Sequence, residues 1–353
     1  MKEQPRIGHY QALFLIISIL FSGLIPLYTT GNQLGRLQWL NLILPLIAGI
    51  LFYYFYSWLA KCLQGQTLDA MYYTLFGKLS HKLALGYFLL FYLFLAAYFM
   101  VAGISLWANL NMPQTPLLIL IALTLLTCLI ISRLGLEVIA RLSMLVIIVF
   151  LALSILDTAF LIPAMRFERL LPLTMPHTQS WLHASSTMLV LLFAPLPLVL
   201  HFLPLVKGPN RVKRSLKIGL WLALAYLIII TFRSILLFGD TLIFTAYAPL
   251  KSLRLLAWSN GVSRLELLSL AASLGIVFLA GSYMLFICSK LLNGISGLKN
   301  SYCHYLLAIV LGFLMYTFSN NNINAIVMIG FGGLSAILLL VISALKQKSG
   351  CKF

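Results

Sequence analysis

Long runs of hydrophobic residues dominate the chain and recur from Ile7 to Leu345. Each run has roughly 17 to 26 residues, which is the length that a helix needs to cross the hydrocarbon layer of a bilayer. Charged and strongly polar residues gather between the runs. The pattern predicts ten membrane-spanning helices, at approximately 8–30, 37–60, 83–107, 116–132, 138–163, 183–206, 216–238, 265–288, 302–318 and 324–345.

Composition excludes the other architectures. Of the 353 residues, 62% are hydrophobic and 9% are charged, whereas soluble proteins have about 45–50% apolar and about 25% charged residues. A membrane β-barrel would show alternation in segments of about ten residues, and a coiled coil or a disordered chain would be rich in charge. The chain is therefore predicted to be an all-α polytopic membrane protein with a single transmembrane domain over residues 1–353.

The net charge of +17 could indicate nucleic-acid binding, so the placement of the 24 Lys and Arg residues matters. If the N-terminus is cytoplasmic, most of them fall in inner connections and at inner helix ends. This bias follows the positive-inside rule and predicts that both termini are cytoplasmic. We expect the basic loops to contact anionic membrane lipids, and we expect no nucleic-acid partner.

Helix-breaking residues occur at matching positions in the first and sixth spans. The two segments read Ser22-Gly23-Leu24-Ile25-Pro26 and Phe193-Ala194-Pro195-Leu196-Pro197. With five spans in each half, equivalent helices run in opposite directions, so two inverted repeats are predicted, at about 8–163 and 183–345. Glycine and proline weaken helical hydrogen bonding, and freed backbone groups cannot face lipid. Two open segments would bind a small zwitterion or anion; the alternative is a pair of kinks without a ligand.

Asp157 and Arg233 are the formally charged residues that fall well inside predicted spans. A charge at the centre of a membrane helix costs roughly 2.5–3.5 kcal/mol on insertion scales, so each needs a partner or a function. Both lie a similar distance from the outer end of their span, and we therefore predict a structural ion pair between them. The alternative is that Asp157 takes up protons during transport.

The residues carry no sign of catalysis. The six His and five Cys residues are dispersed, and there is no Gly-rich phosphate loop, metal-ligand cluster or nucleophile elbow. We expect no cofactor, no metal site and no enzymatic activity.

Several strings resemble one known family when they are taken together. They are Ser22-Gly23-Leu24-Ile25-Pro26, Arg133-Leu134-Gly135-Leu136-Glu137-Val138-Ile139-Ala140-Arg141, Leu170-Leu171-Pro172, Phe238-Gly239 and Ser263-Arg264-Leu265-Glu266. In this order and spacing the chain resembles the B subunits of spore germinant receptors, the endospore germination branch of the amino acid-polyamine-organocation superfamily. It departs at Ser263, where the family usually has an acidic residue, and at Arg169, where it usually has asparagine.

The resemblance implies a ten-helix LeuT-type fold with broken first and sixth helices. It also implies recognition of a small nutrient such as an amino acid in the spore inner membrane, in complex with a larger A subunit and a C-subunit lipoprotein. In that fold the ligand lies between the two broken helices and the faces of the third and eighth spans. The candidate ligand-binding residues are Ser22, Gly23, Pro26, Tyr98, Ala102, Phe193, Ala194, Pro195, Phe278, Ser282 and Tyr283.

Two of these candidates have specific expected roles: Ser22 would donate to a carboxylate, and Phe193 would close over the aliphatic side of the ligand. The favoured function is that of a germinant-sensing subunit that triggers spore germination. The alternative is a proton-coupled amino acid or organic-cation transporter, although few buried acids are present to carry protons. A scaffold or ion channel without a specific pocket is a third class.

Overall fold

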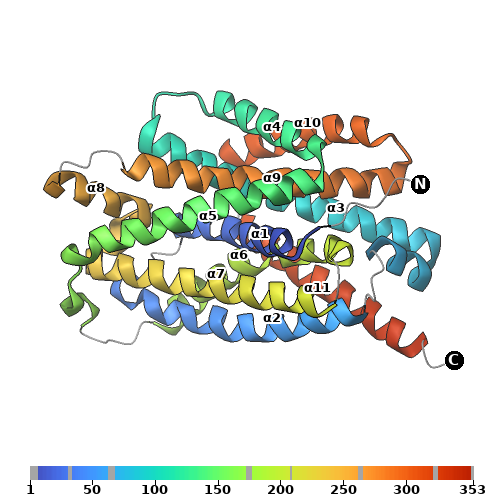
Figure 1. Cartoon of the computed structure of the whole chain (residues 1–353), viewed down its shortest axis with the longest axis horizontal. Helices are drawn as coiled ribbons and strands as arrows, with labels where there is room; N and C mark the ends of the chain where they lie inside the picture. The colour runs from blue at the N-terminus through green and yellow to red at the C-terminus, as the bar shows by residue number, and fades with distance from the viewer. Residues whose placement is uncertain are drawn as a thin grey trace.

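The computed structural model describes residues 7–30, 34–62, 68–171, 177–206, 209–260, 265–320 and 325–350. Pro172, Ser263 and Arg264 of the family-like strings lie outside these residues. The described chain is helical nearly throughout, and most of its helices run along one common axis (Figure 1).

Each predicted span has a helical counterpart in the described residues. These are α1 (His9–Thr30), η1 (Gly35–Leu42) with α2 (Ile43–Cys62), α3 (Leu68–Asn111), α4 (Leu117–Leu134), α5 (Leu136–Leu161), α6 (Thr178–Phe193) with η4 (Leu196–His201) and η5 (Leu203–Leu205), α7 (Pro209–Phe238), α9 (Leu265–Ser296), α10 (Asn300–Asn320) and α11 (Ala325–Gly350). Within the described ranges, nine are long and apolar enough to cross a membrane, and the tenth contains a shorter apolar stretch, Ile326–Ile342. The predicted all-helical polytopic architecture is confirmed.

The first and sixth spans run in opposite directions. Ile7, just before α1, donates its backbone N–H to the Leu205 carbonyl at 3.3 Å, so the start of α1 lies beside the end of span six. At the other end, Tyr28 of α1 and Met188 of α6 line the same small cavity. This antiparallel pairing places the middle of α1 beside the end of α6.

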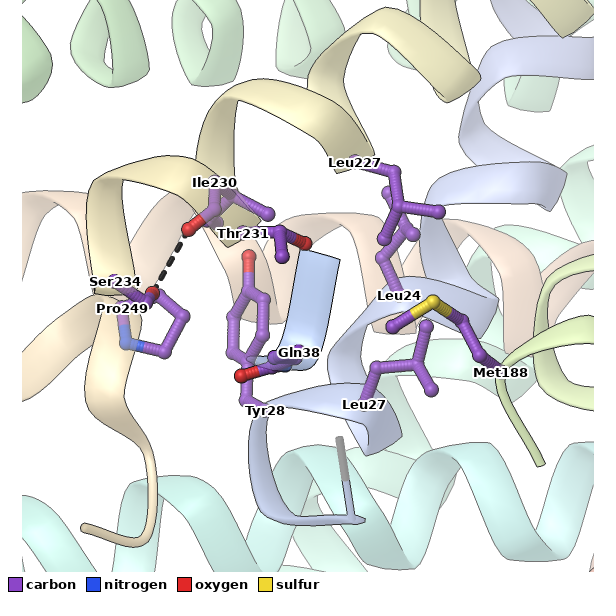
Figure 2. A pocket seen from close by; sticks show the side chains of 10 residues that line it. All are labelled: Leu24, Leu27, Tyr28, Gln38, Met188, Leu227, Ile230, Thr231, Ser234 and Pro249. Carbon is purple, nitrogen blue, oxygen red and sulfur yellow. Dashed lines mark hydrogen bonds between the residues drawn. The ribbon is translucent and has the colours of Figure 1, made fainter. Parts of the chain in front are cut away.

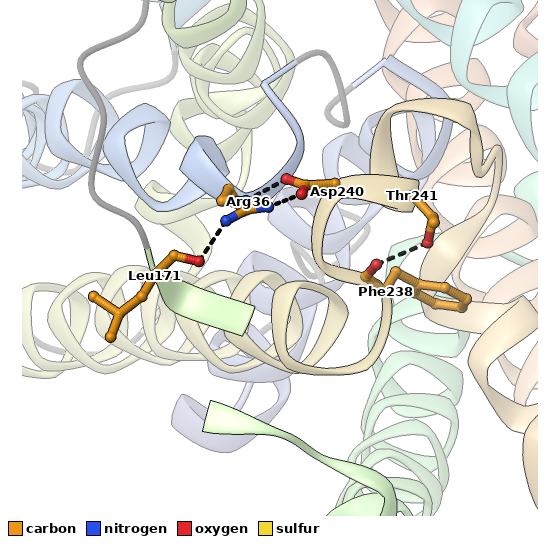
Figure 3. A network of polar contacts seen from close by, with 5 residues as sticks. All are labelled: Arg36, Leu171, Phe238, Asp240 and Thr241. Atoms are coloured by element: carbon orange, nitrogen blue, oxygen red, sulfur yellow. Dashed lines mark hydrogen bonds and ion pairs between the residues drawn. The ribbon is translucent and has the colours of Figure 1, made fainter. Parts of the chain in front are cut away.

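The connections that follow spans one, five and seven meet at one end of the bundle, where α8 (Ala248–Asn260) also lies, at the left of Figure 1. Arg36 of η1 forms an ion pair with Asp240 of η6 (Gly239–Phe244) and donates to the Leu171 carbonyl, which follows η3 (Phe167–Leu170), as Figure 3 shows. Thr241 donates to the Phe238 carbonyl at 2.7 Å. These polar contacts tie three distant segments together at what we call the α8 end.

The most enclosed helices are α1 and α9. In each, 78% of the residues in an apolar 18-residue stretch are buried, compared with 22% in α4 and in α5. Small residues allow α3 and α9 to approach closely: Gly103 faces Val277, and Gly281 faces Met100. The fold therefore places α1 and α9 in the interior, where a membrane protein can hold polar chemistry away from lipid.

Candidate ligand-binding site

Span six is interrupted, as the sequence predicts. The α-helical part ends at Phe193, and the N–H of Ala194 makes the last α-type bond, to the Val190 carbonyl at 2.8 Å. Pro195 and Pro197 have no N–H, so the carbonyls four residues before them lose their helical donors. The chain continues in the narrower 3-10 geometry of η4 and η5.

Span one is not interrupted in this structure, and the prediction that it opens is wrong here. The α-helix runs from His9 to Thr30 with Pro26 inside it. A single proline removes only one hydrogen bond, and the surrounding bundle encloses α1 on most sides. The Ser22 hydroxyl donates within the same helix, to the Ile19 carbonyl at 2.7 Å, and is fully buried. Ser22 is therefore not exposed to an open pocket in this conformation.

The backbones of α1 and α6 touch at Gly23. A Cβ atom added to Gly23 would lie 2.1 Å from the Leu191 carbonyl oxygen and 3.3 Å from the Leu192 Cα. The Leu191 carbonyl is the one that loses its helical donor at Pro195. We call this contact of Gly23 with Leu191 and Leu192 the α1–α6 crossing; Ser22 precedes Gly23 in α1. The glycine is needed because no side chain fits between the two backbones.

Two tyrosines hold the 3-10 half of span six. Tyr283 of α9 donates its hydroxyl to the Leu198 carbonyl at 2.8 Å, and the Tyr92 hydroxyl of α3 lies 3.1 Å from His201 Nε2. The predicted residue Tyr283 is thus brought to the interruption. Tyr92 was missed as a site residue because α3 is hydrophobic on all sides, and the sequence pattern does not show which tyrosine faces span six.

Tyr98 and Ala102 lie on a different face of α3. Both are half-buried, and they follow Phe94 at helical spacing. The Phe94 ring packs against Phe318 of α10, with 5.9 Å between ring centroids. Tyr98, one turn after Phe94, therefore lies on the side of α3 that meets α10, about 120° around the helix from Tyr92.

Phe278 and Ser282 are linked to each other and to α4. The Ser282 hydroxyl donates to the Phe278 carbonyl one turn earlier, and the Cys128 thiol of α4 lies 3.5 Å from the same carbonyl. Ser282 is fully buried and Phe278 is half-buried. These contacts place the Phe278 carbonyl and the Ser282 hydroxyl on the side of α9 that meets α4.

Phe193 packs towards α2 and α11. Its ring centroid is 4.8 Å from that of Phe52. Phe193 and Ala194 line an apolar groove of about 260 Å³, together with Leu334 of α11. The expected gate role of Phe193 over the crossing is not supported by this arrangement, whereas Pro195 remains at the interruption itself.

Asp157 and Arg233 are both buried, with 3% and 6% of their surfaces exposed, but they do not form the predicted direct ion pair. Asp157 Oδ2 accepts a hydrogen bond from the Ser269 hydroxyl at 2.6 Å. Arg233 donates to Thr158 Oγ1 at 3.2 Å and to the Pro249 carbonyl at 3.0 Å. The two helices do meet at the predicted depth, because Thr158 follows Asp157, but Ser269 and Pro249 supply the partners instead.

A metal centre has no basis in the described residues, where no group of three or more His, Cys, Asp or Glu side chains is placed to hold an ion.

Comparisons with known proteins place this geometry in context. A family model described as spore germination protein matches residues 6–325. No curated protein sequence matches the chain. A substrate-bound, outward-open Na⁺-coupled sialic acid symporter is structurally similar, with a TM-score of 0.70 and 13% identity over 96% of this chain and 79% of the symporter chain.

A second similar structure is Mhp1, a nucleobase-cation-symport-1 family transporter, in a closed conformation with bromovinylhydantoin bound. Its TM-score is 0.67 with 13% identity, over 96% of this chain and 78% of that chain. Identities this low show the fold alone. The expected LeuT-type fold is confirmed.

Proposed function

The chain belongs to the spore germination protein family, and on that premise we propose that it is the nutrient-binding membrane subunit of a spore germinant receptor. It is an integral, multi-pass membrane protein with a transporter-like fold. In this proposal a small amino acid is the ligand, and its binding triggers germination.

The proposal rests on the α1–α6 crossing. The last turn of α6, just before the interruption of span six, lies directly against Gly23, and the Leu191 carbonyl there has lost its helical donor. An amino acid's ammonium group supplies such a donor, while the nearby Ser22 hydroxyl supplies one for the carboxylate. The crossing is packed in this conformation, so the nutrient has to stabilise a second arrangement in which the end of α6, together with the 3-10 half that follows it, has moved away from Gly23.

Side-chain contacts make that movement feasible. The 3-10 segment is tied to its neighbours by Tyr283 at Leu198 and by Tyr92 at His201, and its own short-range backbone bonds can move with it as a unit. A ligand shifts the equilibrium between two arrangements only by the difference in its affinity for them. Each tenfold difference in affinity is worth about 1.4 kcal/mol. The sensing step is thus a nutrient-driven repositioning of span six relative to α1.

The test measures whether individual L-amino acids bind to the purified full chain in nanodiscs. The two readouts are the thermal unfolding temperature and equilibrium binding. We expect at least one amino acid to raise the unfolding temperature saturably and Ser22→Ala to weaken its binding. Ser143→Ala is the matched control, because Ser143 is equally buried and bonds to its own helix at Ile139. Absence of binding by every amino acid, or equal weakening in both variants, would refute the proposal.

A transporter is the second candidate function. Both similar solved structures are transporters, and Asp157 is a buried acid that a proton-coupled mechanism requires. Accumulation of labelled amino acid or organic cation in proteoliposomes under a pH gradient would favour the transporter. Saturable binding without accumulation would favour the sensor.

The proposed receptor also contains an A subunit and a C-subunit lipoprotein, and it resides in the spore inner membrane with both termini in the cytoplasm. Co-expression with A-type and C-type subunits, followed by affinity capture, should recover all three. Recovery of this chain alone would count against the assembly.

A further inference from the structure

Two charged side chains in the bundle keep one polar atom each without a hydrogen-bond partner. These atoms are Asp157 Oδ1 and Arg233 Nε, and both are fully buried. Such buried polar atoms are rare in folded proteins and require an explanation. We call the surrounding set of Tyr28, Ser154, Asp157, Thr158, Tyr226, Arg233 and Ser269 the buried polar cluster.

An ionised Asp157 does not fit this arrangement. In a low-dielectric interior a buried carboxylate and a guanidinium on facing helices attract each other strongly. Arg233 nevertheless uses its donors on Thr158 and on the Pro249 carbonyl of α8, while one Asp157 oxygen has no donor. An oxygen without a donor costs much less in a neutral carboxyl group than in an ionised one. We propose that Asp157 is a proton-binding site and that its protonated form holds α8 against the bundle.

The groups that face Asp157 come from four helices. Arg233 and the Tyr226 hydroxyl lie on α7, Tyr28 lies on α1, and Ser269 lies on α9 and donates to Asp157 Oδ2. On α5 itself, the Ser154 and Thr158 hydroxyls flank the acid.

The nearest further acid along α9 is Glu266, about one turn before Ser269. It pairs with Arg254 of α8 at 2.7 Å. Asp157 thus faces mainly neutral hydroxyls and one cation, and loss of its proton changes the charge balance of the cluster.

A chain of hydroxyl groups leads towards Asp157. The Tyr28 and Tyr226 hydroxyls are 3.2 Å apart, and Ser154 Oγ lies 3.4 Å from the Tyr226 hydroxyl. Asp157 follows Ser154 by three residues, which is nearly one helical turn. Hydroxyl groups both donate and accept, so such a chain can pass a proton between α1, α7 and α5.

A small cavity adjoins the start of this chain. It has a volume of about 20 Å³, and Tyr28, Gln38, Thr231 and Ser234 are among its lining residues, as Figure 2 shows. Gln38 Oε1 is buried without a partner. The volume and the polar groups suit one water molecule, which would supply protons to Tyr28.

The same cluster fixes α8. Arg233 donates to the Pro249 carbonyl, and the N–H of Tyr247, just before α8, donates to the Tyr28 carbonyl at 3.0 Å. Asn109 of α3 donates to the Tyr247 hydroxyl at 2.8 Å. When Asp157 loses its proton, the carboxylate attracts Arg233 away from Pro249, and α8 loses one of these tethers. This inference does not depend on which solute the protein binds.

The direct test is infrared difference spectroscopy of the full chain in nanodiscs across a pH series. The wild type should show a titrating carbonyl band of a protonated carboxylic acid, and Asp157→Asn should lack it. Glu266→Gln, which removes the neighbouring acid, is the control and should keep the band. A titrating band that survives in Asp157→Asn, or no such band in the wild type, would overturn the proposal.

The link to α8 is tested by amide hydrogen exchange of residues 245–254, measured at a single pH value above the midpoint of the Asp157 titration. Asp157→Asn mimics the neutral acid and should slow this exchange relative to the wild type. Glu137→Gln removes an acid at the opposite end of α5, where it pairs with Arg141, and should leave this exchange unchanged. Equal or faster exchange in Asp157→Asn would refute the link. If that variant does not fold, Asp157→Glu must shift the midpoint of the infrared band, and an unshifted midpoint would also overturn the proposal.

Discussion

Substitution of Gly23 by alanine tests the contact on which the candidate site depends. The added methyl group would lie 2.1 Å from the Leu191 carbonyl oxygen, whereas ordinary contact begins near 3.4 Å. Both partners are backbone, so no side chain can rotate to make room. The two helices would have to separate by about 1 Å, and the dispersion contacts along the crossing would weaken.

The magnitude follows from two opposing effects. Overpacking of a well-packed interior typically costs 1–3 kcal/mol, while alanine in place of a helical glycine gains about 1 kcal/mol at most. We therefore expect Gly23→Ala to lower the free energy of unfolding by roughly 1–2 kcal/mol, which is about a 5- to 30-fold change in the folding equilibrium.

The assay is reversible unfolding in mixed micelles, with Gly86→Ala as the control. Gly86 also lies in a helix, but an added Cβ there meets nothing within 4 Å. Gly86→Ala should be as stable as the wild type or more stable by up to about 1 kcal/mol. If Gly23→Ala proves as stable as Gly86→Ala, the direct contact of the two backbones is refuted.

Two further predictions concern the segments around the site. Tyr283→Phe removes the hydrogen bond to the Leu198 carbonyl. It should lower the free energy of unfolding by roughly 0.5–1.5 kcal/mol and speed amide exchange in residues 196–205. Unchanged exchange there would contradict the proposal that Tyr283 holds the 3-10 half of span six. Asp240→Asn breaks the ion pair with Arg36 and, because Asp240 is 61% exposed, should cost no more than about 1 kcal/mol. That cost should shrink at high salt, and an equal cost in unfolding measurements at low and high salt would contradict the ion-pair explanation.

The sequence predicted the spans and the interruption of span six because both follow from local chemistry. Hydrophobic length sets the spans, and Pro195 and Pro197 together remove two helical donors within three residues. Pro26 alone did not open α1, because one missing hydrogen bond is outweighed by the packing around an enclosed helix. The two closely spaced prolines of span six interrupt the helix, whereas Gly23 and the single Pro26 of span one do not.

The residues around the interruption were harder to predict because they depend on helix rotation. Tyr98 and Tyr92 are both tyrosines in an α3 sequence that is apolar on every side, and periodicity cannot identify the face that meets span six. Asp157 and Arg233 were correctly placed at one depth. Their actual partners, Ser269 and Pro249, come from segments whose position the sequence does not specify.

The central claim is that a nutrient occupies the α1–α6 crossing, and labelling of a cysteine at position 22 tests it most directly. In a background with the native cysteines replaced by serine, Ser22→Cys should react slowly with a small thiol reagent. The amino acid that stabilises the wild type should change that rate, while Ser143→Cys, equally buried in α5, should react at the same rate with and without it. Stabilisation of the Ser22→Cys protein itself by that amino acid, with no change in labelling at position 22, would contradict the account.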